Sequence, residues 1–131
     1  MYRCLFVLLL LVFTTLSSCR DQVDETQVVA HTAQLYYEAL LQGRYEEFVG
    51  GLDSHVGVSA SYTEQLTANA KMFLERQRQL RDGIKHIAVS DAQIDKAQHT
   101  ANVFLVFSYG DGTSEQVLVP MVERDGVWLM R

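Results

Sequence analysis

The sequence predicts an α+β domain in which N-terminal helices pack on a curved antiparallel meander sheet, in the order α-α-α-β-β-β-β. Apolar residues recur at helical spacing through the first half of the chain, and the spacing changes to the alternation typical of strands after Gly83. Asp-Gly pairs at 111–112 and 125–126 separate the last apolar runs, as hairpin turns do. The length of 131 residues fits one domain.

Three segments have helical spacing. In the first, apolar residues recur at i, i+4, i+7 and i+11 from Val29, and Gly43 follows as a C′ residue. In the third, Ser61 and Glu64 have the spacing of a capping box. We therefore expect helices over about 25–42, 45–49 and 61–81, the last with a buried stripe of Leu66, Ala70, Phe73, Leu74 and Leu80.

Strands follow these helices. Alternation around Ile87 predicts the first strand, which Asp91 should break or bend. The run 101–109 contains the continuously apolar segment 103–107, which is typical of a central strand covered on both faces.

The return strand should span 113–123, and the last strand 127–130. A two-residue turn at Asp111-Gly112 would place Leu105 opposite Leu118 and Phe104 opposite Val119. Pro120 has no N–H to donate, so it favours an edge position or a bulge.

The beginning of the chain has the pattern of an export signal. Arg3 precedes an apolar run at 4–13, which is too short to span a bilayer because a spanning helix needs about 20 residues. The residues LSSC at 16–19 then resemble a bacterial lipobox. The resemblance implies cleavage before Cys19 and acylation of that residue. The alternative is an ordinary secretory signal with Cys19 unmodified.

The chain therefore divides into a lipoprotein signal peptide at 1–18, the lipidated Cys19 with a polar tether at 19–27, and one domain at 28–131. We expect a protein of the bacterial cell envelope, held on a membrane through Cys19, with the choice of membrane left open. The 16 acidic and 11 basic residues give a net charge of −5, which argues against nucleic-acid binding.

Residues from about 27 to 131 resemble the nuclear-transport-factor-2-like (cystatin-like) superfamily, and within it small bacterial lipoproteins that carry a domain of unknown function. The likeness rests on YYEALLQGRYEEF at 36–48, GIKHIAVSDAQID at 83–95 and VFLVFSYGDGTSEQVLVPMVERDGVWLM at 103–130. It implies a curved sheet wrapped around the helices as a cone, either filled or hollow, and dimerisation through the open face of the sheet.

The sequence has no recognisable catalytic pattern. Phosphate-binding loops, dinucleotide-binding glycine patterns and the nucleophile elbow are all absent, so we expect no cofactor and name no catalytic residue. No metal site is expected either, because the histidines lack ligand spacing at positions 31, 55, 86 and 99.

These observations favour a non-catalytic binding protein with a small ligand or a protein partner. Three helices can cover only one face of an apolar sheet, so the other face should meet a second subunit, a ligand or the membrane. Two alternatives stay open: an isomerase- or dehydratase-like enzyme, with a tyrosine donor and a buried carboxylate base in the cone, and a purely structural protein with a filled cone. The candidates for lining a ligand pocket are Tyr36, Tyr37, Phe73, Phe107 and Trp128.

The longest helix is locally basic, with Lys71, Arg76, Arg78 and Arg81 against Glu64 and Glu75. This pattern has two interpretations. One is a surface that docks an anionic partner, and the other is a solvated face stabilised by ion pairs within the helix.

Overall fold

The computed structural model describes residues 24–55 and 57–131, so the predicted signal peptide and Cys19 lie outside it. The order of elements is α2 (Glu25–Leu41), α3 (Tyr45–Gly50), the short 3-10 helix η1 (Asp53–His55), α4 (Ala60–Arg81), β1 (Ile84–Asp95), β2 (Thr100–Tyr109), β3 (Ser114–Arg124) and β4 (Val127–Met130). The prediction of helices followed by a four-stranded meander is confirmed. None of the helices described here is long and apolar enough to cross a membrane.

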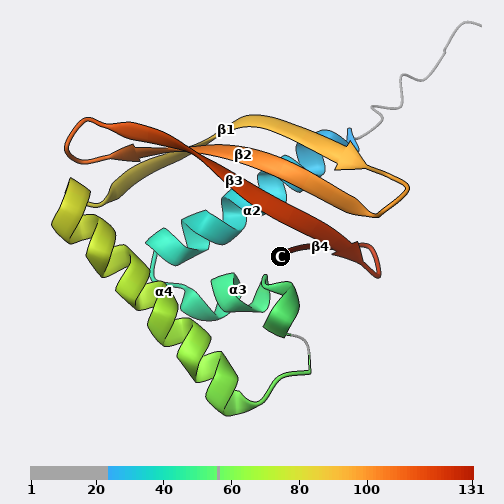
Figure 1. Cartoon of the computed structure of the whole chain (residues 1–131), viewed down its shortest axis with the longest axis horizontal. Coiled ribbons are helices and arrows are strands. Elements are labelled where there is room, and N and C mark those ends of the chain that lie inside the picture. Colours follow the sequence, from blue (N-terminus) through green and yellow to red (C-terminus); the bar gives the residue numbers. More distant parts are fainter. Residues whose placement is uncertain (1–23, 56) are drawn as a thin grey trace, which may run out of the picture.

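The four strands form one antiparallel sheet in the order β1-β2-β3-β4. The three α-helices lie on one side of this sheet (Figure 1). We call that side the inner face and the opposite side the outer face. Alternate residues of β2 are buried on the inner face, and the side chains between them are less buried. The buried ones are Ala101, Val103, Leu105, Phe107 and Tyr109.

Helix α2 supplies the other half of the core. Asp24 caps it by accepting a hydrogen bond from the Thr26 N–H at 3.0 Å. Val29 and Ala33, one turn apart, are fully buried against the strands. The helix ends where Gly43 takes a φ of +75°, as its sequence position predicts.

Helix α4 begins at Ala60, one residue earlier than predicted, because its N-cap lies two residues before the predicted one. Ser59, not Ser61, is the N-cap, and its hydroxyl accepts a hydrogen bond from the Tyr62 N–H at 3.3 Å. The earlier cap lets Ala60 and Ser61 join the helix. At its other end, Asp82 adopts the left-handed conformation just before Gly83, the predicted stop.

The strand predictions hold in outline. Strand β1 has a register irregularity between Val89 and Asp91, which is the predicted bend. Pro120 lies in β3 just beyond the last residue pair with β4, and its carbonyl accepts a hydrogen bond from the Arg131 N–H at 2.9 Å. The Pro120 nitrogen, which carries no hydrogen, faces the same neighbour as the Pro120 carbonyl and not β2. The proline therefore removes no hydrogen bond between β2 and β3.

The predicted register of the β2–β3 hairpin is wrong by one residue. Phe104 faces Leu118, and Leu105 faces Val117. The loop has three residues, Gly110 to Gly112, closed by hydrogen bonds from Tyr109 N–H to the Thr113 carbonyl and from Gly112 N–H to the Tyr109 carbonyl. The loop is a turn followed by a residue in the left-handed conformation. It has one residue more than the predicted two-residue turn, and this residue shifts the pairing of β2 with β3 by one position.

Substitution of Gly112 tests this turn. Its φ is +86°, and a Cβ there would contact nothing within 4 Å, so the cost of Gly112→Ala is conformational. We expect a loss of about 1 kcal/mol in the free energy of unfolding, measured by urea denaturation. Gly50→Ala is the control, since a Cβ at Gly50 is equally unobstructed and its φ is not positive. Equal stability of the two variants would contradict the left-handed turn.

Candidate functional site

Helix α4 leans away from the sheet (Figure 1). Its contacts are chiefly with α3 and β1. Although it has 22 residues, only Ala70 is buried, while Leu66, Phe73 and Leu74 are half-buried. The prediction that Leu80 is buried is wrong, because its side chain lies beside the packed face and is 65% exposed. The helix therefore presents apolar surface that its own domain does not cover.

Two adjoining hollows lie along α4. The first, which we call the inner cavity, has a volume of about 270 Å³ and lies between α2, α3 and α4. Its lining is mostly apolar: Tyr37, Leu40, Phe48, Leu52, Leu66, Asn69, Ala70 and Phe73.

The second hollow, which we call the outer groove, is an open region of the surface along α4. Its lining residues all come from α4: Asn69, Lys71, Met72, Phe73, Glu75, Arg76, Gln79 and Leu80. Asn69 and Phe73 line both hollows, so the groove and the cavity adjoin at these two side chains. The volume of the inner cavity lies just below the range of small-molecule sites, about 300–1,000 Å³.

Aromatic rings form one wall of the inner cavity. The Tyr37 ring lies 5.4 Å from that of Phe48, edge to face, and 5.3 Å from that of Phe107. Such aromatic pairs stabilise the positions of the rings in addition to the stabilisation that burial provides. Burial also raises the pKa of the Tyr37 phenol, so its hydroxyl stays neutral at physiological pH. The cavity therefore has an apolar wall that carries one neutral hydroxyl.

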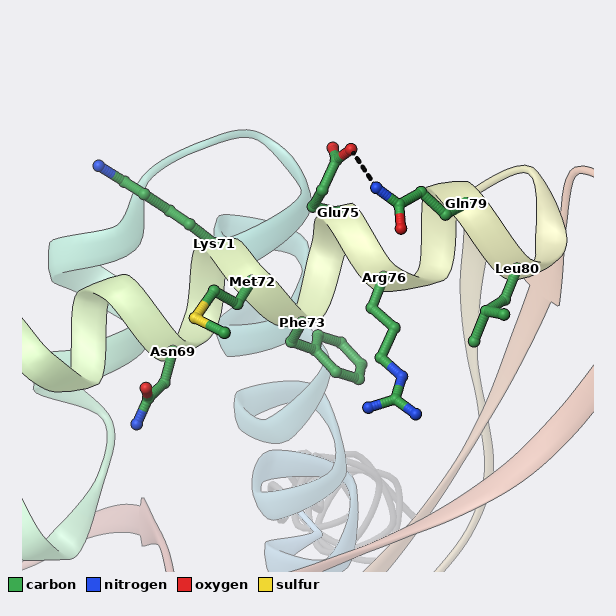
Figure 2. Close-up of a pocket in the computed structure, with 8 residues that line it drawn as sticks. All are labelled: Asn69, Lys71, Met72, Phe73, Glu75, Arg76, Gln79 and Leu80. Atoms are coloured by element: carbon green, nitrogen blue, oxygen red, sulfur yellow. Dashed lines mark hydrogen bonds between the residues drawn. The ribbon is translucent and has the colours of Figure 1, made fainter.

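The side chains of the outer groove project to both sides of α4, with Lys71, Glu75 and Gln79 on the side that faces away from α2 (Figure 2). Asn69, Phe73, Arg76 and Leu80 project to the same side, toward α2 and the strands (Figure 2). They share this side because residues three or four apart are neighbours on a helix. Met72 adds an exposed thioether, with 68% of its side chain accessible. Clustered exposed apolar side chains of this kind are typical of binding surfaces.

The structure separates the predicted pocket candidates. Tyr37 and Phe73 line the inner cavity together, as part of one apolar wall. Phe107 is only 2% exposed and supports Tyr37 from within the core, so it lines neither the cavity nor the groove.

Tyr36 and Trp128 lie elsewhere. The Tyr36 hydroxyl donates to the Trp128 carbonyl at 2.9 Å, which ties α2 to β4. Trp128 lines a different, polar hollow of about 210 Å³, together with Glu25, Ile94, Lys96, His99 and Glu123.

Sequence reasoning missed Asn69, Met72 and Arg76 as lining residues. The spacing of 69, 72, 73, 76 and 80 on one side of the helix was available in the sequence. It could not show that this side of α4 is left uncovered, because that depends on the angle between α4 and the sheet.

The described residues offer no acid–base pair of the isomerase type. No polar or charged side chain is buried among them, whereas a catalytic carboxylate needs burial to raise its pKa. Glu115 is near Tyr109, but it is exposed and paired with Arg81 at 2.7 Å. Nor do residues 24–55 and 57–131 bring together three or more side chains suited to hold a metal ion.

Comparison with known proteins supports the fold. No family model matches the chain, and no curated protein matches it. A solved structure from Campylobacter jejuni, named as a candidate NTF2-like transpeptidase, is similar with a TM-score of 0.59 and 16% sequence identity. The match covers 75% of this chain and 92% of that one. This likeness shows an NTF2-like fold for the chain, in agreement with the superfamily resemblance of the sequence.

Proposed function

We propose that this chain is a lipid-anchored binding protein of a bacterial envelope that takes up an apolar small molecule between α4 and the body of the domain. The observation that carries the proposal is the pair of adjoining hollows along α4, in which Met72 and Leu80 are about two-thirds exposed. Apolar surface that a domain leaves exposed is costly in water, and a ligand would remove it from water.

The inner cavity favours binding over the two alternatives. A purely structural protein would need no hollow between its helices, whereas about 270 Å³ is open between α2, α3 and α4. An enzyme of the isomerase type would need a carboxylate in an apolar setting, and the lining has none, since its polar groups are the Tyr37 hydroxyl and the Asn69 amide. These groups can orient a ligand by hydrogen bonds.

A neutral apolar dye, N-phenyl-1-naphthylamine, tests the binding site. We expect its fluorescence to rise on titration with the protein, and Asn69→Trp to weaken binding at least about tenfold, because a bulky ring where the two hollows meet would block access. Asn69 is exposed, so the variant should keep the fold. The measurement is the dissociation constant from the fluorescence titration.

Glu64→Trp is the matched control for this titration. Glu64 is on the same helix, is exposed, and lines neither the cavity nor the groove. Its variant should bind the dye as the wild type does. An absence of dye binding by the wild-type protein would refute the proposed site, and so would equal binding by Asn69→Trp.

The lipid anchor is a separate part of the proposal and rests on the LSSC sequence at 16–19. One acyl chain gives only marginal membrane binding, so stable anchoring needs the several chains of a bacterial lipoprotein. We expect radiolabelled palmitate to enter the wild-type protein in a bacterial host and not the Cys19→Ala variant. Label in both proteins would refute acylation at Cys19, because Cys4 would then be the remaining thiol.

Dimerisation through the outer face of the sheet stays a prediction. Leu118 is half-exposed there, opposite the partly buried Phe104 of β2. The helices do not cover this side of the sheet (Figure 1).

A further inference from the structure

We infer that the preferred ligand is an amphiphile with an alkyl chain and a carboxylate head, and that Arg76 binds the head. The inference rests on the proposed function and adds the chemical class of the ligand. The chain would occupy the apolar inner cavity, and the head would lie in the outer groove.

The position of Arg76 supports this arrangement. It lies one turn after Phe73, which lines both hollows as Asn69 does, and one turn before Leu80. Its guanidinium extends to the same side of the helix as the Phe73 ring (Figure 2). A ligand whose chain passes Phe73 into the cavity would therefore leave its outer end beside Arg76.

The other basic side chains of α4 already have partners. Arg78 donates to Glu75 at 2.9 Å, and Arg81 pairs with Glu115 at 2.7 Å. Lys71 lies over the Tyr45 ring, 5.2 Å from its centre. Glu75, the acidic residue of the groove, also accepts a hydrogen bond from Gln79.

Arg76 differs from these residues. Within residues 24–55 and 57–131, it makes no hydrogen bond and no ion pair. A guanidinium beside apolar side chains has five donors in a planar fork, which suits the two oxygens of a carboxylate. With a neutral ligand of the same chain length, the guanidinium N–H groups would remain hydrogen-bonded to water. The charge of Arg76 therefore favours an anionic head over a neutral one.

Displacement of the bound dye by dodecanoate and by dodecanol tests the inference at alkaline pH, below the micelle concentration of dodecanoate and below the solubility limit of dodecanol. The Cys19→Ala chain serves as the parent protein, so that no attached acyl group competes. We expect dodecanoate to bind about tenfold more tightly than dodecanol. Arg76→Gln should remove this preference by lowering the affinity for dodecanoate about tenfold. About 1 M NaCl should reduce the preference, because it shortens the screening length to about 3 Å.

Arg78→Gln is the matched control, since Arg78 is on the same helix, is exposed and is paired with Glu75. It should change dodecanoate binding by less than about twofold. Equal loss in both variants would overturn the assignment to Arg76, and so would a dodecanoate affinity that Arg76→Gln does not change while the dye still binds. Failure of the dye itself to bind would instead refute the proposed function.

Discussion

Replacement of Phe107 by alanine should destabilise the domain by about 3–5 kcal/mol, the range observed for large aromatic truncations in closely packed cores. Phe107 is 2% exposed and lies in the middle of the inner face of β2. Its ring contacts that of Tyr37, with 5.3 Å between the centres. Because small domains are stable by only about 5–15 kcal/mol, urea denaturation should show a large fall in the midpoint.

The same substitution should also affect the candidate site. Tyr37 lines the inner cavity, and Phe107 supports its ring from the side of the sheet. Loss of that support would leave a void behind the cavity wall, so dye binding should weaken even where the protein stays folded. The titration would be carried out at a temperature well below the melting temperature of the variant.

Phe104→Ala provides a control in the same strand. Phe104 is three residues away, so it lies on the opposite, outer face, and it is only partly buried. Its truncation should cost about 1 kcal/mol, which is expected for a partly exposed side chain. Similar losses for Phe104→Ala and Phe107→Ala would contradict the assignment of the inner and outer faces.

The succession of elements was predictable because the period of the apolar residues changes once, at Gly83. The hairpin register was not, because Asp111-Gly112 fits both a two-residue turn and the three-residue loop that forms. At Asp125-Gly126, both residues have positive φ and the two-residue turn does form. The two turns differ in their contacts with the rest of the chain. The Gly110 N–H donates to the Gly83 carbonyl at 2.9 Å, which ties the β2–β3 turn to the segment that follows α4.

The candidate site was predictable only in part. Tyr37 and Phe73 could be named, because they are large aromatic residues on the apolar faces of predicted elements. The same reasoning also selected Phe107, which the structure places in the core, and Trp128, which lies at a different hollow. Burial of a given aromatic ring depends on how distant segments pack. The exposure of Leu80 likewise follows from the tilt of α4, which no local pattern determines.

A second large effect is expected for Gly51→Ala, at the junction of α3 and β4. A Cβ on Gly51 would lie 2.5 Å from two ring carbons of Tyr36, much closer than atoms can pack. The φ of Gly51 is −81°, which any residue adopts, so the cost is entirely steric. The ring would have to move, and its hydroxyl would lose the hydrogen bond to the Trp128 carbonyl. Overpacking and the lost hydrogen bond together should cost about 2–4 kcal/mol.

Two variants separate these contributions, with the melting temperature as the measurement. Tyr36→Phe removes only the hydroxyl and should cost about 1 kcal/mol. Gly50→Ala adds a methyl group one residue earlier, where nothing lies within 4 Å, and should be neutral or slightly stabilising because it is in a helix. If Gly51→Ala melted like Gly50→Ala, the Tyr36 ring could not lie against Gly51. The link between α2 and β4 would then need another explanation, since it depends on that ring position.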